Sequence, residues 1–492
     1  MDLSNLNFGA PSAERDIELG LANYFVKTEA FKRVAGRKKT IVLGNRGSGK
    51  SAIFKVLARQ ARDSGAIVLE LSPEDYSYEM LSSTMHSESK GSWAKYGAYS
   101  AGWKYLIWVL IMKSVTAAGP KLKTGDAAKI YTYIRDNHAT IDRNPIAVLI
   151  SYLKRIEGVK IGTVEVKLKT AELAKLYKLE EIHQLLPALK NVCERRKIFV
   201  FVDELDRGWD SSEDAKAFVA GLFQACVSIN EQIENVTVYV SLRRELYDSI
   251  PELYDDAQKY RDIIETITWD ESALLSLMAK RIQHGISELS DADDESCWHA
   301  VFSETLQYRQ TKSFNYFVDR TLYRPREMIQ FCSDTLQAAK DINSFPIDYD
   351  IISIVELRYS EDRAKDIAAE YRFQYPGLLS IFEVFRGLTY TFDREDLELL
   401  CLAITTGEYR IDDAAEAWVS KQDYELLIEI LWRVGFLRAQ AVGGVKALRR
   451  SGSKYLGPHQ VSNLNLRNIS RFHVHPMFRA YLGMKESKEK TS

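Results

Sequence analysis

The order of apolar and polar positions along the chain predicts strands that alternate with helices. Apolar runs of strand length, rich in Val, Ile and Leu, occur at residues 40–43, 66–71, 198–202, 236–242 and 262–269. An amphipathic repeat follows the first run, with Ile53, Val56 and Leu57 on one side of an expected helix. Strands separated by helical stretches form parallel sheets that are covered on both faces. The predicted fold class is therefore α/β with a parallel, doubly wound sheet.

The composition is that of an ordinary soluble globular protein. Of the 492 residues, 46% are hydrophobic and 27% are charged, and the formal net charge is −2. Without a global basic excess, any contact with nucleic acid must come from a local patch. The most lipophilic run, Tyr105 to Met112, is shorter than the about 20 residues that a membrane span needs. The sequence starts without a signal-peptide pattern, and its five cysteines show no CxxC spacing, so we expect reduced thiols in a cytoplasmic protein.

A glycine-rich loop after the first strand fits the phosphate-binding pattern GxxxxGK[ST] at every specified position. Its residues are Gly44, Asn45, Arg46, Gly47, Ser48, Gly49, Lys50 and Ser51. Glycines let backbone N–H groups turn toward a phosphate, and the following helix start adds its positive dipole end. Lys50 can reach the β- and γ-phosphates, and the Ser51 hydroxyl can bind Mg²⁺. The loop predicts ATP and Mg²⁺ as cofactors. The alternative is a chance surface turn.

Two acidic residues follow another buried strand. Asp203 stands where it can bind Mg²⁺ through water, and Glu204 where it can polarise the attacking water. The alternative is an acidic, solvated turn. Asp206 and Arg207 come next, either as a second layer around the site or as a local salt bridge.

The stretch DELDR, residues 203–207, resembles the strand ending of STAND- and KAP-type NTPases, a branch near the AAA+ ATPases. The order of the elements is similar to that of AAA+ proteins, including origin-recognition ATPases. Nearly the whole chain also resembles bacterial stand-alone P-loop ATPases of anti-phage defence islands, which open with a similar Phe-Gly-Ala-Pro segment, here residues 8–11. The resemblance implies a Mg²⁺-dependent P-loop ATPase.

The same resemblance implies roles for residues beyond the loop. In AAA+ relatives, the end of the fourth strand carries a polar sensor of the γ-phosphate, a place that Ser241 or Arg243 takes here. An early arginine of the lid helix meets the γ-phosphate, which implies Arg326, with Arg324 as the second choice. Chain before the phosphate loop often packs over the adenine, a role for which Phe25 is a candidate.

Pattern and resemblance together divide the chain. The expected parts are an ATPase core (1–75 with 191–270), a mainly helical insert (76–190), a helical lid (271–341), a helical connector (342–386) and a winged-helix domain (387–492). We expect subunit or partner contacts in the insert. Its aromatic residues Trp93, Tyr96 and Tyr99 recur at helical spacing, which favours core packing over a platform for stacking bases.

The expected winged helix combines basic and acidic stretches. Residues 441–480 contain no acid and seven bases: Lys446, Arg449, Arg450, Lys454, Arg467, Arg471 and Arg479. Such a basic stretch is usually a solvated face or a protein contact, and a non-specific contact with nucleic acid through residues 441–480 is the alternative. The helix that would enter the major groove carries Asp423, Glu425 and Glu429, which would repel phosphates. His473 and His475 lack a third ligand nearby in sequence, so the phosphate loop is the only metal site that we expect.

Two functions fit these features. The first is an ATP-hydrolysing switch that forms a homo-oligomer and controls an effector protein encoded nearby, in anti-phage defence as the resemblance implies. Arg243, Arg244 or Arg261 would then supply an arginine finger to a neighbouring subunit. The alternative is a DNA-handling ATPase of the initiator or transposition-helper type, anchored by its winged helix. Neither function involves a membrane.

Overall fold

The structure is a computed structural model, and its chain forms two compact units. It describes residues 3, 6–72, 92–117, 119, 124–138, 179–194, 196–206, 209, 211–251, 253, 260–308, 310–440, 455–461 and 464–486. One unit comprises residues 27–268, and the other combines residues 1–26 with residues 269–492. The expected division placed residues 1–26 in the ATPase core together with residues 27–75. In the structure, residues 1–26 belong to the same unit as residues 269–492.

The unit of residues 27–268 is built on a parallel five-stranded sheet, which confirms the predicted sheet type. Its strands are β1 (Ile41–Gly44), β2 (Ile67–Leu71), β3 (Ile198–Val202), β4 (Val236–Arg243) and β5 (Ile264–Thr266). Their order in the sheet is β2-β3-β4-β1-β5, so the strand before the glycine-rich loop lies inside the sheet. All five carboxyl ends lie at one edge, because every recorded pairing is parallel.

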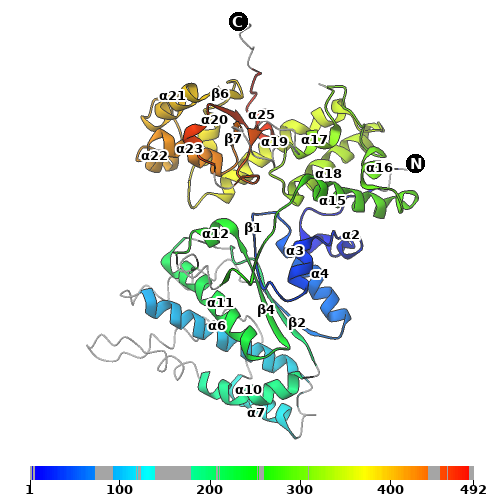
Figure 1. The fold of residues 1–492 in the computed structure, drawn as a ribbon, viewed down its shortest axis with the longest axis vertical. Coiled ribbons are helices and arrows are strands. Elements are labelled where there is room, and N and C mark those ends of the chain that lie inside the picture. Colours follow the sequence, from blue (N-terminus) through cyan, green and yellow to red (C-terminus); the bar gives the residue numbers. More distant parts are fainter. Residues whose placement is uncertain are drawn as a thin grey trace. The chain divides into compact units, whose positions relative to one another are not determined.

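Helices cover both faces of this sheet (Figure 1). Helices α3 (Glu29–Ala35) and α4 (Lys50–Asp63) lie on one side, and α11 (Glu213–Gln232) and α6 (Ser92–Val115) lie on the other. The Phe54 ring of α4 packs against the Phe201 ring of β3, with centroids 5.2 Å apart. On the opposite side, the Cys226 thiol of α11 donates to the Val238 carbonyl of β4 at 3.1 Å. The sheet is therefore doubly wound, as predicted.

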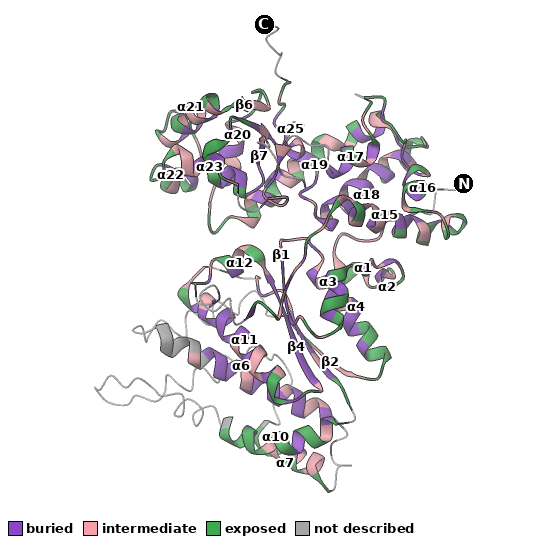
Figure 2. Cartoon of the chain, in the orientation of Figure 1, coloured by how far each residue is buried: buried purple, intermediate pink, exposed green. Residues whose placement is uncertain are grey.

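The insert contributes directly to the core of this unit. From residue 99 to residue 115, most of helix α6 is buried (Figure 2). Trp103, Tyr105 and Trp108 are at most 1% exposed. Trp103 Nε1 donates to the Phe218 carbonyl of α11 at 3.1 Å, and Tyr99 packs edge-on against the Phe218 ring. Core packing of Tyr99 is thus confirmed, and the insert is less separate from the core than expected.

Two shorter insert helices follow, α7 (Asp126–His138) and α10 (Leu179–Cys193). Within the described part of the chain, no helix combines the length and apolarity that crossing a bilayer requires. All five cysteines are buried as free thiols.

The other unit begins with a helical layer. It contains α1 (Ala13–Asp16), α2 (Leu21–Tyr24), α15 (Glu271–Gly285), α16 (Asp294–His299), α17 (Ser313–Val318), α18 (Pro325–Ile342), α19 (Tyr349–Glu370) and α20 (Leu378–Glu383). Pro325 occupies the first turn of α18, where a proline removes no helical hydrogen bond. The helical character expected for the lid and the connector is therefore present.

A buried ion pair fixes the N-terminal segment to this unit. Arg281 of α15 donates from Nη2 to Asp16 Oδ2 at 2.8 Å, and the two side chains are only 3% and 2% exposed. The second carboxylate oxygen of Asp16 accepts from the Tyr24 hydroxyl at 2.8 Å and from the Ala10 N–H at 2.7 Å. Gly9 has a φ of +77°, and a Cβ there would lie 2.2 Å from Asp16 Oδ1. The Phe-Gly-Ala-Pro segment is thus shaped by a buried carboxylate.

The last part of the chain forms a small antiparallel sheet with helices. In chain order it contains β6 (Thr391–Asp393), α21 (Arg394–Thr405), α22 (Asp413–Val419), α23 (Tyr424–Arg433), β7 (Leu437–Gln440), β8 (Tyr455–Leu456), β9 (Arg471–Val474) and α25 (Pro476–Arg479). The strand order is β6-β9-β7-β8. Helices α21, α22 and α23 and the closing strand β9 lie in the part where the winged-helix domain was expected. Residues 443 and 444, where a wing would turn, lie outside the described residues, and the winged-helix assignment stays a prediction.

Replacing Asp16 by alanine should strongly destabilise the unit that contains it. The Arg281 guanidinium would remain buried without its carboxylate, and removing one partner of a buried pair typically costs about 3–5 kcal/mol. Urea denaturation followed by circular dichroism measures the loss. As a control, Glu361→Ala breaks the exposed pair with Lys365 in the same unit and should leave the midpoint unchanged. An Asp16→Ala midpoint equal to that of the wild type would contradict this role.

Candidate functional site

The glycine-rich loop lies at the carboxyl edge of the parallel sheet, between β1 and α4. Gly47 and Gly49 have φ values of +77° and +95°, a region that favours glycine. A Cβ on Gly44 would approach Ser48 Oγ to 2.4 Å, so the loop closes tightly only because position 44 has no side chain. Ser51 lies half-buried in the first turn of α4. The loop therefore has the backbone conformation that its sequence predicts.

The Lys50 side chain turns back over this loop. Its Nζ donates to the Gly44 carbonyl at 2.8 Å and to the Asn45 carbonyl at 3.1 Å, and the residue is only 9% exposed. Burial lowers the pKa of the Lys50 ammonium, and the negative charges of Glu245, Asp203 and Asp206 partly offset this effect. The loop thus holds a buried positive charge among carbonyl oxygens, with acids nearby.

Asp203 and Ser241 meet on the face of the sheet that carries α4. Side chains alternate along a strand, so Asp203 follows Phe201 and Ser241 follows Tyr239 onto one side, where the Phe201 and Tyr239 rings stack 5.1 Å apart. The Ser241 hydroxyl donates to Asp203 Oδ1. The carboxylate predicted to bind Mg²⁺ and the predicted polar sensor are therefore direct partners.

Glu204 has an unusual backbone conformation next to this pair. Its φ is +59°, and its N–H donates to Asp203 Oδ1 at 2.9 Å. A glutamate in this region is strained, and such strain persists where the surroundings enforce it, often at functional sites. The backbone of the residue that was expected to activate water is thus held by the carboxylate beside it.

Arg243 forms an ion pair with Asp206, both less than a quarter exposed. This pair joins the segment after β3 to the end of β4, so Asp206 bonds to a residue far away in sequence. Arg207 was predicted to form, with Asp206, either a second layer around the site or a local salt bridge. It lies outside the described residues. Sequence reasoning singled out both residues of the pair but did not connect them.

Glu245 is a member of the site that sequence reasoning missed. It lies half-buried in the short helix α12 (Arg244–Asp248), directly after β4, and its charge stabilises the Lys50 ammonium more than that of Asp203 does. The sequence feature that could have identified Glu245 is its position two residues after Arg243, just after a strand that neighbours β1.

The two other arginines proposed for a neighbouring subunit lie in different places. Arg244 is exposed and bonds to Asp248 one helical turn later. Arg261 precedes β5 and therefore lies at the amino edge of the sheet, away from the phosphate loop, where its carbonyl accepts from Lys39 Nζ at 3.2 Å. The structure does not bring Arg261 together with the other candidates.

The two lid candidates belong to the other unit and differ sharply. Arg324 is 6% exposed, and its Nη1 donates to Glu370 at 2.7 Å with Glu327 also nearby, so its charge is already satisfied inside the unit. Arg326 is half-buried and donates from Nε to the Pro11 carbonyl at 3.3 Å. These contacts argue against Arg324 as a phosphate sensor. Phe25 also belongs to this unit, at the end of α2.

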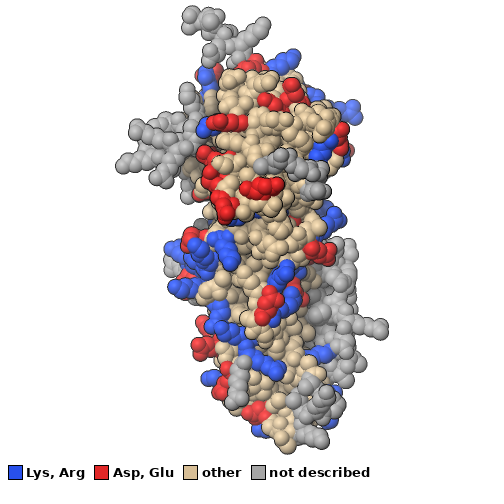
Figure 3. Space-filling model, turned by 90° about the vertical axis from the view of Figure 1, so that its right-hand side faces the viewer, with Lys and Arg blue, Asp and Glu red and all other residues tan. Residues whose placement is uncertain are grey.

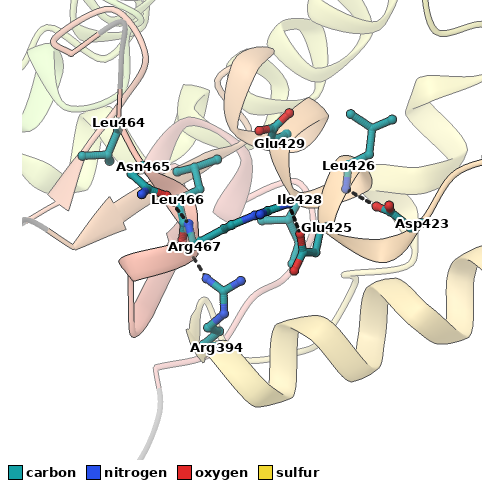
Figure 4. Close-up of a pocket in the computed structure, with 10 residues that line it drawn as sticks. All are labelled: Arg394, Asp423, Glu425, Leu426, Ile428, Glu429, Leu464, Asn465, Leu466 and Arg467. Carbon is teal, nitrogen blue, oxygen red and sulfur yellow. Dashed lines mark hydrogen bonds and ion pairs between the residues drawn. The ribbon is translucent and has the colours of Figure 1, made fainter.

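A surface pocket of about 300 Å³ opens beside the start of α23 (Figure 4). Asp423, Glu425 and Glu429 line it, together with Arg394 and Arg467. Arg467 bonds to Glu425 at 3.0 Å, and the Asp423 carboxylate caps α23 at the Leu426 N–H. The helix expected to enter a DNA groove therefore presents carboxylates, as its sequence indicated.

The two histidines near β9 are packed residues. Burial lowers the pKa of His473 to about 3, and its ring stacks on Tyr455. His475 accepts at Nδ1 from the Met477 N–H at 3.2 Å. Across the described ranges, three or more His, Cys, Asp or Glu residues nowhere gather into a metal-binding group.

The loop and the adjacent acids fit a magnesium-bound nucleoside triphosphate. The glycines leave the backbone N–H groups accessible to phosphate, Lys50 supplies a buried positive charge, and its recorded hydrogen bonds go to neutral carbonyls. Ser51 and Asp203 are oxygen ligands of the kind that Mg²⁺ prefers. The residues that the sequence singled out thus form a coherent donor set at one sheet edge.

Comparison with protein families gives two partial matches. Residues 8–67, which include the phosphate loop, match the family described as ORC-CDC6-like. Residues 272–368, from α15 into α19, match the FunZ-associated C-terminal helical domain. The first match, taken with the parallel sheet, supports a P-loop ATPase fold of the AAA+ type.

Comparison with individual proteins gives matches of low sequence identity. The chain is 22% identical over 495 residues to the putative transposon gamma-delta 80.3 kDa protein of Escherichia coli strain K12, which covers 97% of this chain and 66% of the relative. The chain thus spans slightly less than two thirds of that protein. Among solved structures, the Aeropyrum pernix ORC2 protein in its ADPNP–ADP complexes matches with 12% identity and a TM-score of 0.29, covering 96% of this chain and 95% of that one.

Replacing Ser241 by alanine should weaken the Mg²⁺-dependent part of ATP binding. The Asp203 carboxylate would lose one hydrogen bond, worth about 1 kcal/mol or about fivefold in affinity. Calorimetric titration with ATP, in Mg²⁺ and in EDTA, separates the two parts. Thr237→Ala changes the far end of the same strand face and should bind ATP like the wild type. An equal loss with and without Mg²⁺ would contradict the proposed role of the Ser241–Asp203 bond.

Proposed function

We propose that this protein binds ATP with Mg²⁺ and hydrolyses it, acting as a molecular switch of the AAA+/STAND-like type. The observation that carries the proposal is the buried Lys50 ammonium beside Asp203, at the carboxyl edge of a parallel sheet. Burying a full charge is costly, and the nearby carboxylates offset this cost only in part. The phosphates of magnesium-bound ATP would supply further compensation.

Each residue of the site has a defined task in this proposal. Lys50 and the loop N–H groups hold the phosphates, and Ser51 and Asp203 hold the metal. The metal, when bound, neutralises charge that develops on the phosphate oxygens. Glu204 accepts a proton from the attacking water, and its backbone bond to Asp203 fixes its position.

A switch requires that the binding of ATP changes the contacts of residues around the site. Arg243 bonds to Asp206 in the structure, and the pair connects the ends of β3 and β4 beside the phosphate loop. A γ-phosphate would compete with Asp206 for the guanidinium, because both are anionic oxygens. We infer that Arg243 senses the γ-phosphate by exchanging partners, with Arg326 as the second sensor from α18.

The partners of the switch are proposed on the resemblance alone. The active state would be a homo-oligomer in which Arg244, exposed on α12, is the better placed finger than Arg243, which Asp206 already engages. An effector protein would respond to the oligomer. Anti-phage defence is the context that the resemblance implies, and the names of the matched proteins do not refer to it.

A DNA-handling ATPase is the second candidate, and the relative named as a transposon protein favours it. In this candidate, the C-terminal part would be a winged helix that contacts DNA through its basic residues 441–480. The carboxylates on α23 oppose readout of a groove by that helix. Contact with the DNA backbone outside the α23 face remains compatible with them.

Glu204→Gln should abolish hydrolysis without abolishing binding. A positioned general base contributes about 10²–10⁴ in rate, so turnover should fall by that factor while ATP affinity stays within about twofold. Phosphate release and calorimetric titration measure the two quantities. Glu234→Gln, before β4 at the opposite edge of the sheet, is the matched control and should hydrolyse ATP like the wild type. Turnover that survives in Glu204→Gln would remove Glu204 from the reaction.

A further inference from the structure

One surface of the unit of residues 27–268 is rich in bases and is built from α3 and α4. Residues 27–62 contain eleven Lys or Arg and a single acid, Glu29. Two of the bases, Arg46 and Lys50, belong to the phosphate loop. The nine others lie on α3, on α4 or next to them: Lys27, Lys32, Arg33, Arg37, Lys38, Lys39, Lys55, Arg59 and Arg62. We call this surface the α3–α4 face.

The two helices share one side of the sheet. The Tyr239 hydroxyl of β4 donates to the Val34 carbonyl of α3 at 3.1 Å, and the Tyr239 ring packs near Phe54 of α4 with centroids 6.1 Å apart. Both helices therefore cover the sheet face to which Tyr239 points. Their polar sides face away from the sheet on the same side of the unit. Figure 3 shows Lys and Arg side chains gathered on the side of the protein where α3 and α4 lie.

Part of this charge is neutralised within the fold. Arg33 forms a two-bond contact with the buried Glu265, each bond 2.7 Å long, and Lys55 and Arg62 share Glu70. These pairs attach α3 to β5 and α4 to β2. Lys32 pairs with Glu29, Arg37 donates to the Glu234 carbonyl, and Lys39 donates to the Arg261 carbonyl. Six of the nine cations therefore have partners within the fold.

The other three cations of the face have no such partner among the described residues. Lys27, Lys38 and Arg59 are exposed, and none makes a side-chain hydrogen bond or ion pair with the residues that the structure describes. Like charges gathered on one surface repel one another and destabilise the fold slightly. Their retention on one face is accounted for if an anionic partner binds there.

We propose that the α3–α4 face binds the phosphate backbone of a nucleic acid. An electrostatic contact without apolar anchors is typical of backbone binding, whereas protein interfaces usually contain buried aromatic or aliphatic anchors. All of the large apolar side chains recorded as exposed in the described residues belong to the other unit, from Leu19 to Tyr409. The α3–α4 face thus has the charge for phosphate and lacks the anchors for a protein or a lipid surface.

The same charge argument excludes the α21–α23 region as the main contact. Residues 393–429 contain eleven Asp or Glu and three Lys or Arg, and carboxylates line the pocket at α23. A polyanion would be repelled there. The inference deepens the DNA-handling candidate by naming its surface, and it uses no residue assigned to ATP.

The test is a salt titration of binding by the full-length protein. The probe is a fluorescent 30-base-pair duplex of mixed sequence, followed by anisotropy from 50 to 300 mM salt. The test variant is Lys27→Gln/Lys38→Gln/Arg59→Gln. The control, Lys312→Gln/Arg410→Gln/Lys421→Gln, removes the same charge from exposed positions of the other unit. A third variant, Arg449→Gln/Arg450→Gln/Lys454→Gln, tests the basic stretch of the C-terminal part.

The proposal predicts that the slope of log K against log salt becomes shallower by about 2.7 in the test variant, three contacts at about 0.9 each. The control variant should keep the wild-type slope, and all variants should keep the wild-type ATPase rate. If the test variant keeps the wild-type slope and the third variant loses binding, the α3–α4 face is not the contact surface. The DNA-handling function would still stand in that case. No duplex binding by the wild type at 50 mM salt would overturn both. Poly-glutamate that displaces the duplex as well as unlabelled duplex does would assign the face to an acidic protein instead.

Discussion

The burial of one positive charge organises the site. The Lys50 ammonium is nearly inaccessible to water, and burial alone would favour its neutral form. Carbonyls of the loop accept its hydrogen bonds, and three carboxylates from two separate segments partly stabilise its charge: Asp203 and Asp206 after β3, and Glu245 after β4. Parallel strands carry these segments to one edge. The sheet thus brings together charges that are distant in sequence, and an anionic ligand completes their balance.

The order of the strands makes this arrangement necessary. Because β1 lies between β4 and β5, the loop after β1 is flanked by the ends of these two strands, and the end of β3 lies one strand further along the same edge. Ser241 bonds to Asp203, and Arg243 pairs with Asp206, so two residues at the end of β4 each contact a residue that follows β3. A change at one end of either pair is transmitted to the other end by direct contact, which is what a switch would use.

The sequence was sufficient for features encoded locally. The glycine-rich loop, the acids after β3 and the parallel sheet depend on short patterns with a fixed period, and the structure contains them. It was insufficient for pairings between distant segments. The Asp206–Arg243 pair and the burial of Arg324 by Glu370 depend on tertiary contacts that no local pattern encodes. Likewise, helix α6 was assigned to a separate insert, whereas its large aromatic residues fill the core beside α11. Residues 1–26 joined the other unit because Asp16 pairs with Arg281, 265 positions later.

The most direct test of the account is calorimetric titration of the wild-type protein and Lys50→Ala with MgATP. The account predicts one site per chain in the wild type and an affinity about 10- to 100-fold lower in the variant, because hydrogen bonds to a charged group contribute about 1.5–3 kcal/mol. Circular dichroism should show the same fold in both proteins, since the recorded Lys50 bonds go only to its own loop. A wild-type protein that does not bind MgATP, or a variant that binds it equally well, would contradict the central claim.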